Sequence, residues 1–216
     1  MIEFDNVSCT FVKGAGIVDA SFNIDKGEFV CVIGPTGAGK TTLLRLIYMD
    51  VIPEKGRVIV DKYDSSRIKR RQIPLLRRKV GMVFQEFNLL SDRNVFENVA
   101  LPLRVIGVPK KEIKDRVNRV LDELEIDHRW NHLPSELSGG EQQIVSLARA
   151  VVKNPLVILA DEPTGNLDPV ASYKILTLLE KINENGTAIL FATHSYNLVK
   201  DRGHRFMDVI DCKVRT

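Results

Sequence analysis

Short apolar stretches typical of β-strands begin the chain and return near its end. Residues 20–24 alternate apolar and polar positions, as a half-buried strand does, while residues 29–33 are continuously apolar. A continuous run of that length suits a strand that is buried on both faces of a parallel sheet. Strands are further expected at 2–7, 58–60, 80–84, 156–160 and 188–192, with a turn at 13–16.

Helical periodicity dominates between residues 95 and 152. Residues 111–126 place a set of apolar side chains on one helical face, namely Ile113, Val117, Val120, Leu121 and Leu124. Helices are also expected at 41–47 and 170–182, each beside predicted strands. This alternation predicts an α/β fold with a parallel sheet, and the middle segment predicts a helical subdomain inserted into it.

Composition narrows the class of protein without indicating a function. The 216 residues are 44% hydrophobic and 27% charged, which is typical of a globular protein rather than a disordered one. No apolar run approaches the ~18 residues of a membrane-spanning helix, and the acidic N-terminus predicts no secretory signal. Three scattered cysteines indicate a reducing compartment, with neither a disulfide framework nor a zinc site. A net charge of +3 is too small to indicate nucleic-acid binding, so no nucleic-acid partner is expected.

A glycine-rich loop separates the apolar strand at 29–33 from the helix at 41–47. Its sequence fits the pattern G-x-x-x-x-G-K-[ST], in which backbone N–H groups surround phosphate oxygens. Lys40 is expected to reach the β- and γ-phosphates of a nucleotide, and the Thr41 hydroxyl to join the shell of a Mg²⁺ ion. The alternative is a turn with a surface lysine, which the matching flanks disfavour. The residues assigned to nucleotide binding here are Gly34, Pro35, Thr36, Gly37, Ala38, Gly39, Lys40, Thr41 and Thr42.

Polar residues at the ends of three further predicted strands form a candidate catalytic set. Asp161 is expected to contact Mg²⁺ at the sheet edge, and the adjacent Glu162 to polarise a water molecule. A solvated acidic pair is the alternative for these two residues. His194 is expected to contact the γ-phosphate, although a lone histidine is more often structural. Gln85 can bond a metal-bound water or sense the γ-phosphate, a weak signal by itself.

A serine followed by two glycines begins another predicted helix. Ser138 and Glu141 have the spacing of a capping box at a helix N-terminus. Gly139 and Gly140 carry no side-chain bulk, so the exposed N–H groups of this helix start favour a second anion-binding site. A simple capped helix is the alternative, and spacing alone does not choose between the two.

Taken together, these motifs resemble the ABC-type ATPase family over the whole chain. Six features occur in the order and spacing that is typical of that family. They are the phosphate loop, Gln85, the Leu-Ser-Gly-Gly segment, the Asp161-Glu162 pair, the Asn-Leu-Asp segment ending at Asp168, and His194. The resemblance implies a P-loop fold with a mostly parallel core sheet, an N-terminal antiparallel β subdomain and a helical subdomain. It implies one domain over 1–216, with the core and β subdomain at 1–86 and 153–216 and the helical subdomain at 87–152.

The resemblance also implies a homodimer that forms head to tail on binding ATP and Mg²⁺. Each ATP would lie between the phosphate loop of one subunit and Ser138, Gly139 and Gly140 of the other. Phe11 would stack on adenine in place of the family's usual tyrosine, and Asp168 would belong to the nucleotide-contacting set. The implied catalytic residues are Glu162 as general base with His194, Gln85 and Lys40, and the implied metal ligands are Thr41, Gln85 and Asp161.

Finer features are similar to one branch of this family. Residues 161–168 resemble a group of cell-division, lipoprotein-release and macrolide-export ATPases, and residues 73–81 and 89–99 most resemble the FtsE-type cell-division members. This implies an integral membrane partner resembling FtsX, a peripheral place on the cytoplasmic face of the plasma membrane, and control of cell-wall hydrolysis. The alternatives are a lipoprotein-release or macrolide-export ATPase, a soluble ABC ATPase acting on DNA or ribosomes, and a P-loop kinase of a small molecule.

One residue and one segment have features whose role the sequence does not decide. Ile144 stands where the family usually has arginine, which bears on helix positioning and on the rate of hydrolysis. Residues 67–79 carry seven basic side chains and no acidic one. They indicate either a solvated face or a contact with anionic lipid headgroups or an acidic partner.

Overall fold

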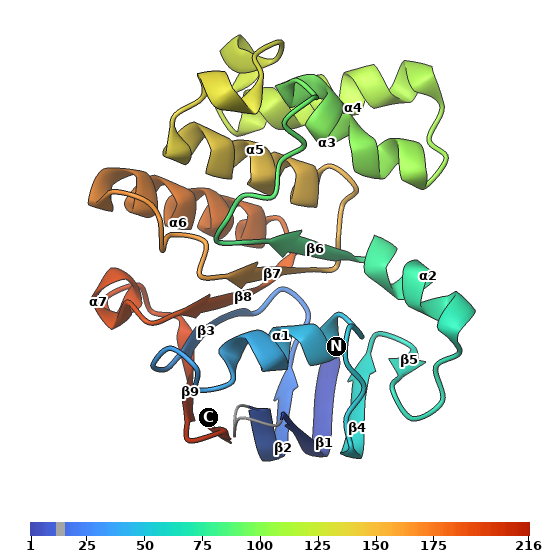
Figure 1. Cartoon of the computed structure of the whole chain (residues 1–216), viewed down its shortest axis with the longest axis vertical. Helices are drawn as coiled ribbons and strands as arrows, with labels where there is room; N and C mark the ends of the chain where they lie inside the picture. Colours follow the sequence, from blue (N-terminus) through green and yellow to red (C-terminus); the bar gives the residue numbers. More distant parts are fainter. Residues whose placement is uncertain (12–15) are drawn as a thin grey trace.

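The computed structural model describes residues 1–11 and 16–216. The turn expected at 13–16 therefore lies outside the described residues, except for Gly16. The N-terminal strands form an antiparallel sheet in the order β2-β1-β4-β5 (Figure 1). Phe4 and Phe22 stack across this sheet with their ring centroids 4.3 Å apart. The bounds of its strands are β1 (Ile2–Thr10), β2 (Gly16–Ile24), β4 (Lys55–Val60) and β5 (Tyr63–Asp64).

A second sheet of six strands forms the core, in the order β10-β9-β3-β8-β7-β6. Its strands pair in parallel from β9 to β6, and only β10 is antiparallel, which confirms the predicted mostly parallel sheet. Sequence patterns did not indicate β9 and β10, because polar residues interrupt the apolar positions of β9 and because β10, at the sheet edge, is only three residues long. The bounds are β3 (Phe29–Ile33), β6 (Val80–Val83), β7 (Val157–Asp161), β8 (Ala188–Thr193), β9 (Arg205–Ile210) and β10 (Lys213–Arg215).

Helices cover both faces of the core sheet (Figure 1). Helix α1 lies between the two sheets, and its leucines share one hydrophobic cluster with Val30 and Val32 of β3. The opposite face of β3, with Phe29 and Cys31, belongs to a cluster that continues through α6 into α3, α4 and α5. The bounds are α1 (Lys40–Ile47), α2 (Ile73–Arg78), α3 (Val95–Val105), α4 (Lys110–Glu123), α5 (Gly139–Val151), α6 (Pro169–Glu184) and α7 (Tyr196–Val199), with 3₁₀ turns at Arg70–Gln72, Asp127–Arg129 and Pro134–Glu136.

The apolar run at 29–33 is buried on both faces because successive side chains of a strand point to opposite sides. The helix expected at 111–126 ends at Glu123, and Glu125 takes a left-handed φ of 58° that turns the chain away. Ile144 is 4% exposed and packs into the helical cluster, so an apolar residue suits this position in the fold. Within the described parts of the chain, no helix is long and apolar enough to cross a membrane.

Candidate functional site

The phosphate loop joins β3 to α1 at the carboxyl edge of the core sheet. Gly39 has a left-handed φ of 115°, and a Cβ atom added there would lie 2.1 Å from the Gly16 carbonyl oxygen. A Cβ atom on Gly34 would lie equally close, 2.1 Å, to the carbonyl oxygen of Val209. Both glycines are therefore required by the packing of the loop against neighbouring strands.

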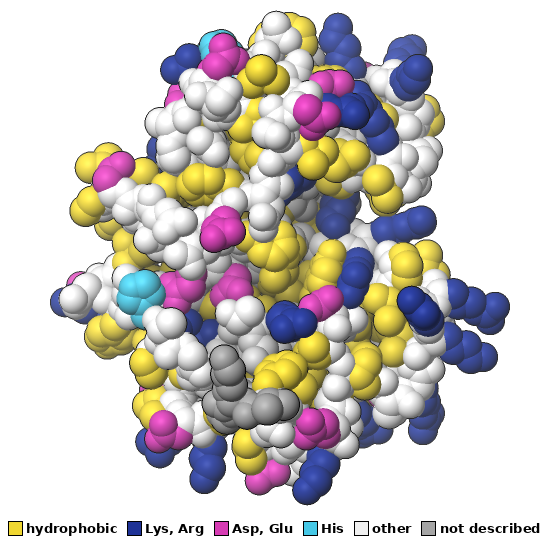
Figure 2. Space-filling view, in the orientation of Figure 1, with side chains coloured by type: hydrophobic (Ala, Val, Ile, Leu, Met, Phe, Trp, Pro, Cys, Tyr) yellow, Lys and Arg dark blue, Asp and Glu magenta, His cyan; other side chains and the backbone are white. Residues whose placement is uncertain are grey.

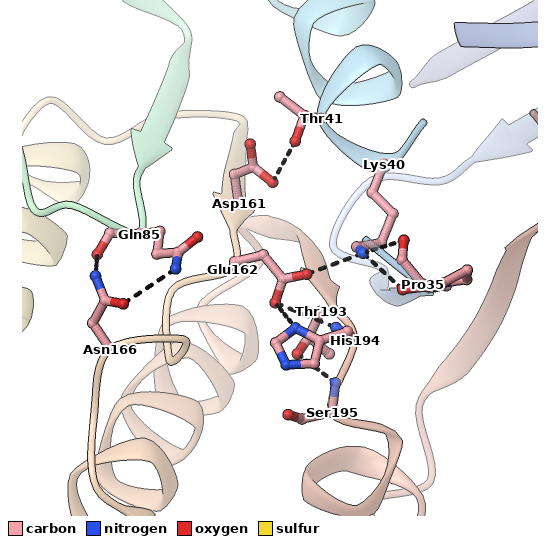
Figure 3. Close-up of polar contacts among 11 residues, drawn as sticks. Pro35, Lys40, Thr41, Gln85, Asp161, Glu162, Asn166, Thr193, His194 and Ser195 are labelled. Atoms are coloured by element: carbon pink, nitrogen blue, oxygen red, sulfur yellow. Dashed lines mark hydrogen bonds and ion pairs between the residues drawn. The ribbon is translucent and has the colours of Figure 1, made fainter. Parts of the chain in front are cut away.

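Lys40 turns back over this loop from the first position of α1 (Figure 3). Its ammonium group donates to the carbonyl oxygens of Gly34 at 2.7 Å and Pro35 at 3.1 Å. It also lies 3.0 Å from Oε1 of Glu162, and both side chains are largely buried. The lysine charge is thus held inside the loop by neutral carbonyls and one carboxylate.

Thr41 and Asp161 bring a hydroxyl and a carboxylate together beside the lysine. The Thr41 hydroxyl donates to Oδ1 of Asp161 at 3.2 Å, across the gap between α1 and the end of β7. Burial raises the pKa of Asp161; the Thr41 hydrogen bond lowers it, Glu162 raises it further and Lys40 lowers it. A cation at this position would favour the ionised carboxylate and reverse the effect of burial.

The donors near Asp161 fit Mg²⁺ better than they fit a softer metal. Hydroxyl, carboxylate and amide oxygens are hard ligands, and Mg²⁺ commonly combines one or two carboxylates with substrate phosphates and water. No group of three or more His, Cys, Asp or Glu side chains that could hold a metal occurs in the described parts of the chain. The ion would therefore need phosphate oxygens to complete its shell.

Glu162 faces away from Asp161, toward Lys40 and His194. Its backbone has a left-handed φ of 47°, rare for a residue with a side chain, and its N–H donates to the Ala192 carbonyl at 2.9 Å. Its Oε2 atom lies 2.9 Å from Nδ1 of His194 and accepts from the His194 N–H at 3.3 Å. The unusual backbone thus directs the two adjacent carboxylates to different partners, as expected of two groups with separate roles.

Gln85 follows β6 and is tied to the loop after β7. Its amide donates to Oδ1 of Asn166 at 3.2 Å, and the Asn166 amide donates to the Gln85 carbonyl at 3.3 Å (Figure 3). The reciprocal pair places the Gln85 side chain beside the carboxylates. Sequence analysis assigned no role to Asn166.

These side chains surround one cleft of about 360 Å³, the phosphate-loop cleft. A smaller hollow of about 210 Å³ adjoins it and is lined by Asp161, Glu162, Gln85 and Thr41 among others. The structure thus brings together residues predicted from four separate segments. Those lining the phosphate-loop cleft are Thr36, Gly37, Gly39, Lys40, Thr41, Thr42, Gln85, Glu162 and His194.

Ser138, Gly139 and Gly140, hereafter the signature segment, do not line this cleft. Ser138 caps α5 in the predicted capping box: Glu141 Oε2 accepts from the Ser138 N–H and hydroxyl, each at 2.8 Å. The hydrogen bond from the Ser138 backbone is the main cause that lowers the pKa of Glu141 to about 2. Gly140 packs against α6, where an added Cβ would lie 3.1 Å from Cβ of Ala171.

Two other residues predicted to contact nucleotide are also placed by the structure. Asp168 caps α6, accepting from the N–H groups of Val170 at 2.9 Å and Ala171 at 3.0 Å. Phe11 follows the end of β1 with 40% of its surface exposed, and the Arg45 guanidinium lies 5.9 Å from its ring centroid. Its free aromatic face can take a stacked base.

Two side chains of α5 that sequence reasoning missed hold the loops around the site. Gln143 donates to the carbonyls of Phe84 at 3.1 Å and Pro163 at 2.6 Å, which joins the loops after β6 and β7. Arg149 donates to the carbonyls of Phe87 at 2.9 Å and Asn88 at 2.6 Å, where the backbone is left-handed. A buried amide on an otherwise apolar helix face was the available signal for Gln143.

Comparison with known proteins gives consistent similarities. A family model described as "ABC transporter" matches residues 17–165. The cell division ATP-binding protein FtsE of Bacillus subtilis is 45% identical over 98% of this chain and 93% of its own length. FtsE of Escherichia coli is 43% identical over 98% of this chain and 96% of its own length.

Solved structures agree in fold with these relatives. The dimeric ATP-binding cassette MJ0796, in a post-hydrolysis state bound to ADP and Pi, has a TM-score of 0.89 at 36% identity. That match covers 100% of this chain and 97% of the other. The structure of cbiO1 from Clostridium perfringens, part of an ABC transporter complex, has a TM-score of 0.90 at 27% identity and covers 100% of this chain and 86% of the other.

Proposed function

Since the chain belongs to the ABC transporter family of ATPases, we propose that it is the ATP-hydrolysing subunit of a cell-division complex of the FtsE type. Two copies would close head to tail on two ATP molecules, hydrolyse them and reopen. The observation that carries this proposal is the phosphate-loop cleft, in which Lys40, Glu162 and His194 are joined in one chain of contacts.

Nucleotide binding would exchange the partners of Lys40. Its ammonium group donates to two carbonyls and pairs with Glu162. A triphosphate offers stronger acceptors at the same place, and the N-terminus of α1 adds backbone N–H groups and a positive dipole end. Thr41, Asp161 and Gln85 would hold Mg²⁺, which would offset the charge of the phosphates.

Hydrolysis would then fall to Glu162. Once Lys40 has turned to phosphate, Oε1 of Glu162 is free to accept a proton from an attacking water. Its Oε2 atom remains against His194, which fixes the direction of the carboxylate. The exposed part of the His194 ring would reach the γ-phosphate, so that Lys40 and His194 both stabilise charge in the transition state.

The signature segment would act on the nucleotide of the other subunit. It lies outside the cleft of its own chain, yet its helix start has the donors of an anion site. In the closed pair, Ser138, Gly139 and Gly140 of the partner subunit would cover the phosphates. Phe11 would stack on adenine, and Asp168 would belong to the same interface.

Replacing Glu162 with glutamine tests this scheme. Glu162→Gln keeps a similar shape and removes the base, so hydrolysis should fall by about 10²–10⁴-fold while ATP still binds. The dimer should accumulate with MgATP and be seen by analytical ultracentrifugation. Glu184→Gln, on the exposed end of α6, is the matched control and should turn over like the parent protein. Wild-type turnover by Glu162→Gln would remove Glu162 from this role.

A membrane partner resembling FtsX would receive the shape change and place the protein at the cytoplasmic face of the plasma membrane. Next to Gln85, the chain offers partly exposed apolar side chains, Phe87, Leu89 and Leu90. A groove of about 320 Å³ lies beside them, lined by Tyr48, Met82, Phe84, Leu101, Pro102, Arg149 and Lys153 among others. Burial lowers the pKa of Lys153 to about 8.

The basic segment 67–79 would face anionic headgroups beside this groove. Arg77 and Lys79 are paired with Asp50 and Asp61, but no ion pair of the other five basic residues is found among the described residues. Figure 2 shows Lys and Arg side chains projecting along the side of the molecule where Figure 1 places α2. Leu75 on α2 is 43% exposed among them. A lysine- and arginine-rich surface with an exposed leucine suits an anionic membrane.

Capture from detergent-solubilised membranes tests the partner. The bait should retain an integral membrane protein resembling FtsX, and Leu90→Asp should reduce the capture. Val105→Asp is a matched control, because Val105 is also an exposed apolar residue but lies at the far end of α3. Capture of only a transporter permease would support the export or lipoprotein-release alternative, and stimulation of hydrolysis by DNA or ribosomes alone would support the soluble one.

Flotation with lipid vesicles tests the contact between residues 67–79 and anionic headgroups. Equal flotation on anionic and neutral vesicles would reject this lipid contact.

A further inference from the structure

The hydroxyl proton of Ser138 is already committed within its own chain. Glu141 is ionised at neutral pH, since its pKa lies near 2, and an ionised carboxylate only accepts hydrogen bonds. The Ser138 hydroxyl lies 2.8 Å from Oε2 of Glu141 and must therefore donate to it. The Ser138 hydroxyl oxygen in turn accepts from the Glu141 N–H at 3.3 Å. A phosphate facing Ser138 would thus compete with Glu141 for one proton.

Arg129 holds the other oxygen of this carboxylate. It projects from the 3₁₀ turn Asp127–Arg129 and donates from Nε to Oε1 of Glu141 at 2.8 Å. The Arg129 side chain is 35% exposed and that of Glu141 is 22% exposed, so the pair lies in a half-buried position. On its other side, Nη1 of Arg129 lies 3.4 Å from Nε2 of His132. Glu141 has no second cation within ion-pair distance among the described residues.

We propose that Arg129 is a positioning residue of the signature segment, which offsets the charge of Glu141 so that Ser138 can be released to the phosphate of the opposing nucleotide. The inference rests on the proposed function, in which Ser138 meets a nucleotide held by the partner subunit. Arg129 would thus act on the signature segment from outside it, and Glu141 would have a second role besides capping α5.

The charges explain why the arginine matters more to closure than to folding. A triphosphate arriving at Ser138 meets the Glu141 carboxylate through one intervening hydroxyl, and two anions at that range repel each other. Arg129 offsets the negative charge of Glu141. By attracting part of that charge, it also weakens the hydrogen bond that Glu141 accepts from the Ser138 hydroxyl. A half-exposed ion pair contributes little to the stability of the fold itself. The effect of losing Arg129 should therefore appear when the two copies close.

The experiment is a double-mutant cycle in the Glu162→Gln background, read as the ATP-driven dimerisation constant by analytical ultracentrifugation. Arg129→Met removes the charge and should weaken dimerisation about tenfold, less so at high salt, because the repulsion is screened. Glu141→Gln removes the competing anion while keeping a side chain that can cap the helix. In the Glu141→Gln background, Arg129→Met should change dimerisation by less than about twofold. Arg116→Met is the matched control, since Arg116 pairs with Glu112 at 3.2 Å on exposed α4, and it should have no effect.

The outcomes separate this inference from the proposed function. If the Glu162→Gln parent stays monomeric with MgATP, the closure scheme fails and the role of Arg129 fails with it. If the parent dimerises and Arg129→Met dimerises equally well, the inference alone is overturned. It is also overturned if Arg129→Met weakens dimerisation to the same extent with and without Glu141, or if salt leaves the loss unchanged. Urea unfolding of Arg129→Met should show a midpoint close to that of the parent.

Discussion

The phosphate loop and the signature segment are both helix starts built for anions, but they differ in how complete they are. Around the phosphate loop, side chains from α1, the loop after β6, β7 and the end of β8 converge on one cleft. At the signature segment, the capping contacts come from the start of α5 and from Arg129 in the 3₁₀ turn before it. The first gathers its residues within one chain, whereas under the proposed function the second would be half of a site that an opposing subunit completes.

In both regions, the side-chain hydrogen-bond donor contacts a carboxylate of the same chain. Lys40 is held by Glu162 and two carbonyls, and the Ser138 hydroxyl is held by Glu141. In each case a carboxylate of the same chain occupies the group that would bind phosphate. In the proposed scheme nucleotide would displace these contacts, which would link its binding to a rearrangement of side chains in both regions.

The largest difference between the regions should appear when Lys40 is removed. Lys40→Met deletes the cation on which the phosphates would converge, so MgATP affinity should fall about 100-fold or more, in line with about 3 kcal/mol for a charged contact. Calorimetric titration of the monomer measures this. Lys26→Met, in an exposed turn, is the control and should bind like the parent. Unchanged affinity in Lys40→Met would place the phosphates elsewhere.

Alanine at one glycine of each region should separate folding from closure. In Gly39→Ala the new Cβ would lie 2.1 Å from the Gly16 carbonyl at a φ of 115°, which should cost about 2–4 kcal/mol of unfolding free energy. In Gly139→Ala the nearest atoms would be 3.6 Å and 3.7 Å away, and alanine favours a helix by about 0.5–1 kcal/mol.

Gly139→Ala should therefore unfold at an equal or higher urea concentration and bind MgATP as a monomer, yet its dimerisation in the Glu162→Gln background should weaken about tenfold. That loss is expected because the methyl group would stand between the helix N–H groups and the opposing phosphate. Equal destabilisation by the two alanines would contradict the distinction between a complete site and half of one.

The smallest expected effect is the response of the signature segment to acid. The pKa of Glu141 falls from an ordinary 4.5 to about 2 in the folded protein, so its contribution to stability is present above pH ~4.5 and is lost as the pH falls toward 2. Relative to Glu141→Gln, the wild-type protein should lose about 1 kcal/mol of unfolding free energy between pH 6 and 3.5, a value reduced by partial exposure. Urea titrations of both proteins at each pH measure the difference. A constant difference across this range would show that the carboxylate is not held as described.

Much of the fold was predictable because its strands are short and continuously apolar. The run 29–33 has no polar position to conceal its burial, and the prediction gave the observed bounds. Strands β9 and β10 were not, because Arg205 and Asp208 interrupt the apolar positions of β9 and because β10 has only three residues, two of them basic. Helix α2 was also not predicted, since its six residues combine a proline with two arginines.

The residues of the candidate site likewise include some that the sequence predicted and others that it did not. Motif spacing was enough to select Lys40, Thr41, Asp161, Glu162 and His194, since each lies at the end of an apolar strand or in a glycine pattern that depends on few neighbours. Gln143 and Arg149 donate to backbone carbonyls of loops that are distant in sequence. Every residue has such a carbonyl, so the sequence does not indicate which one accepts the hydrogen bond. Arg129 could not be chosen among the other cations, because its contact with Glu141 depends on where the turn Asp127–Arg129 lies against the start of α5.

By itself, then, the amino-acid order determined strands β3, β6, β7 and β8, the residue types at their carboxyl ends and the Ser138–Glu141 capping box, because those are local consequences of periodicity, spacing and glycine chemistry. Tertiary structure alone decided the other pairings: that Glu162 turns to Lys40 and His194 rather than to Asp161, and that Arg129 holds Glu141. Such contacts depend on where separate elements come to lie, and the direction of a side chain in space is set by the packing of the whole chain.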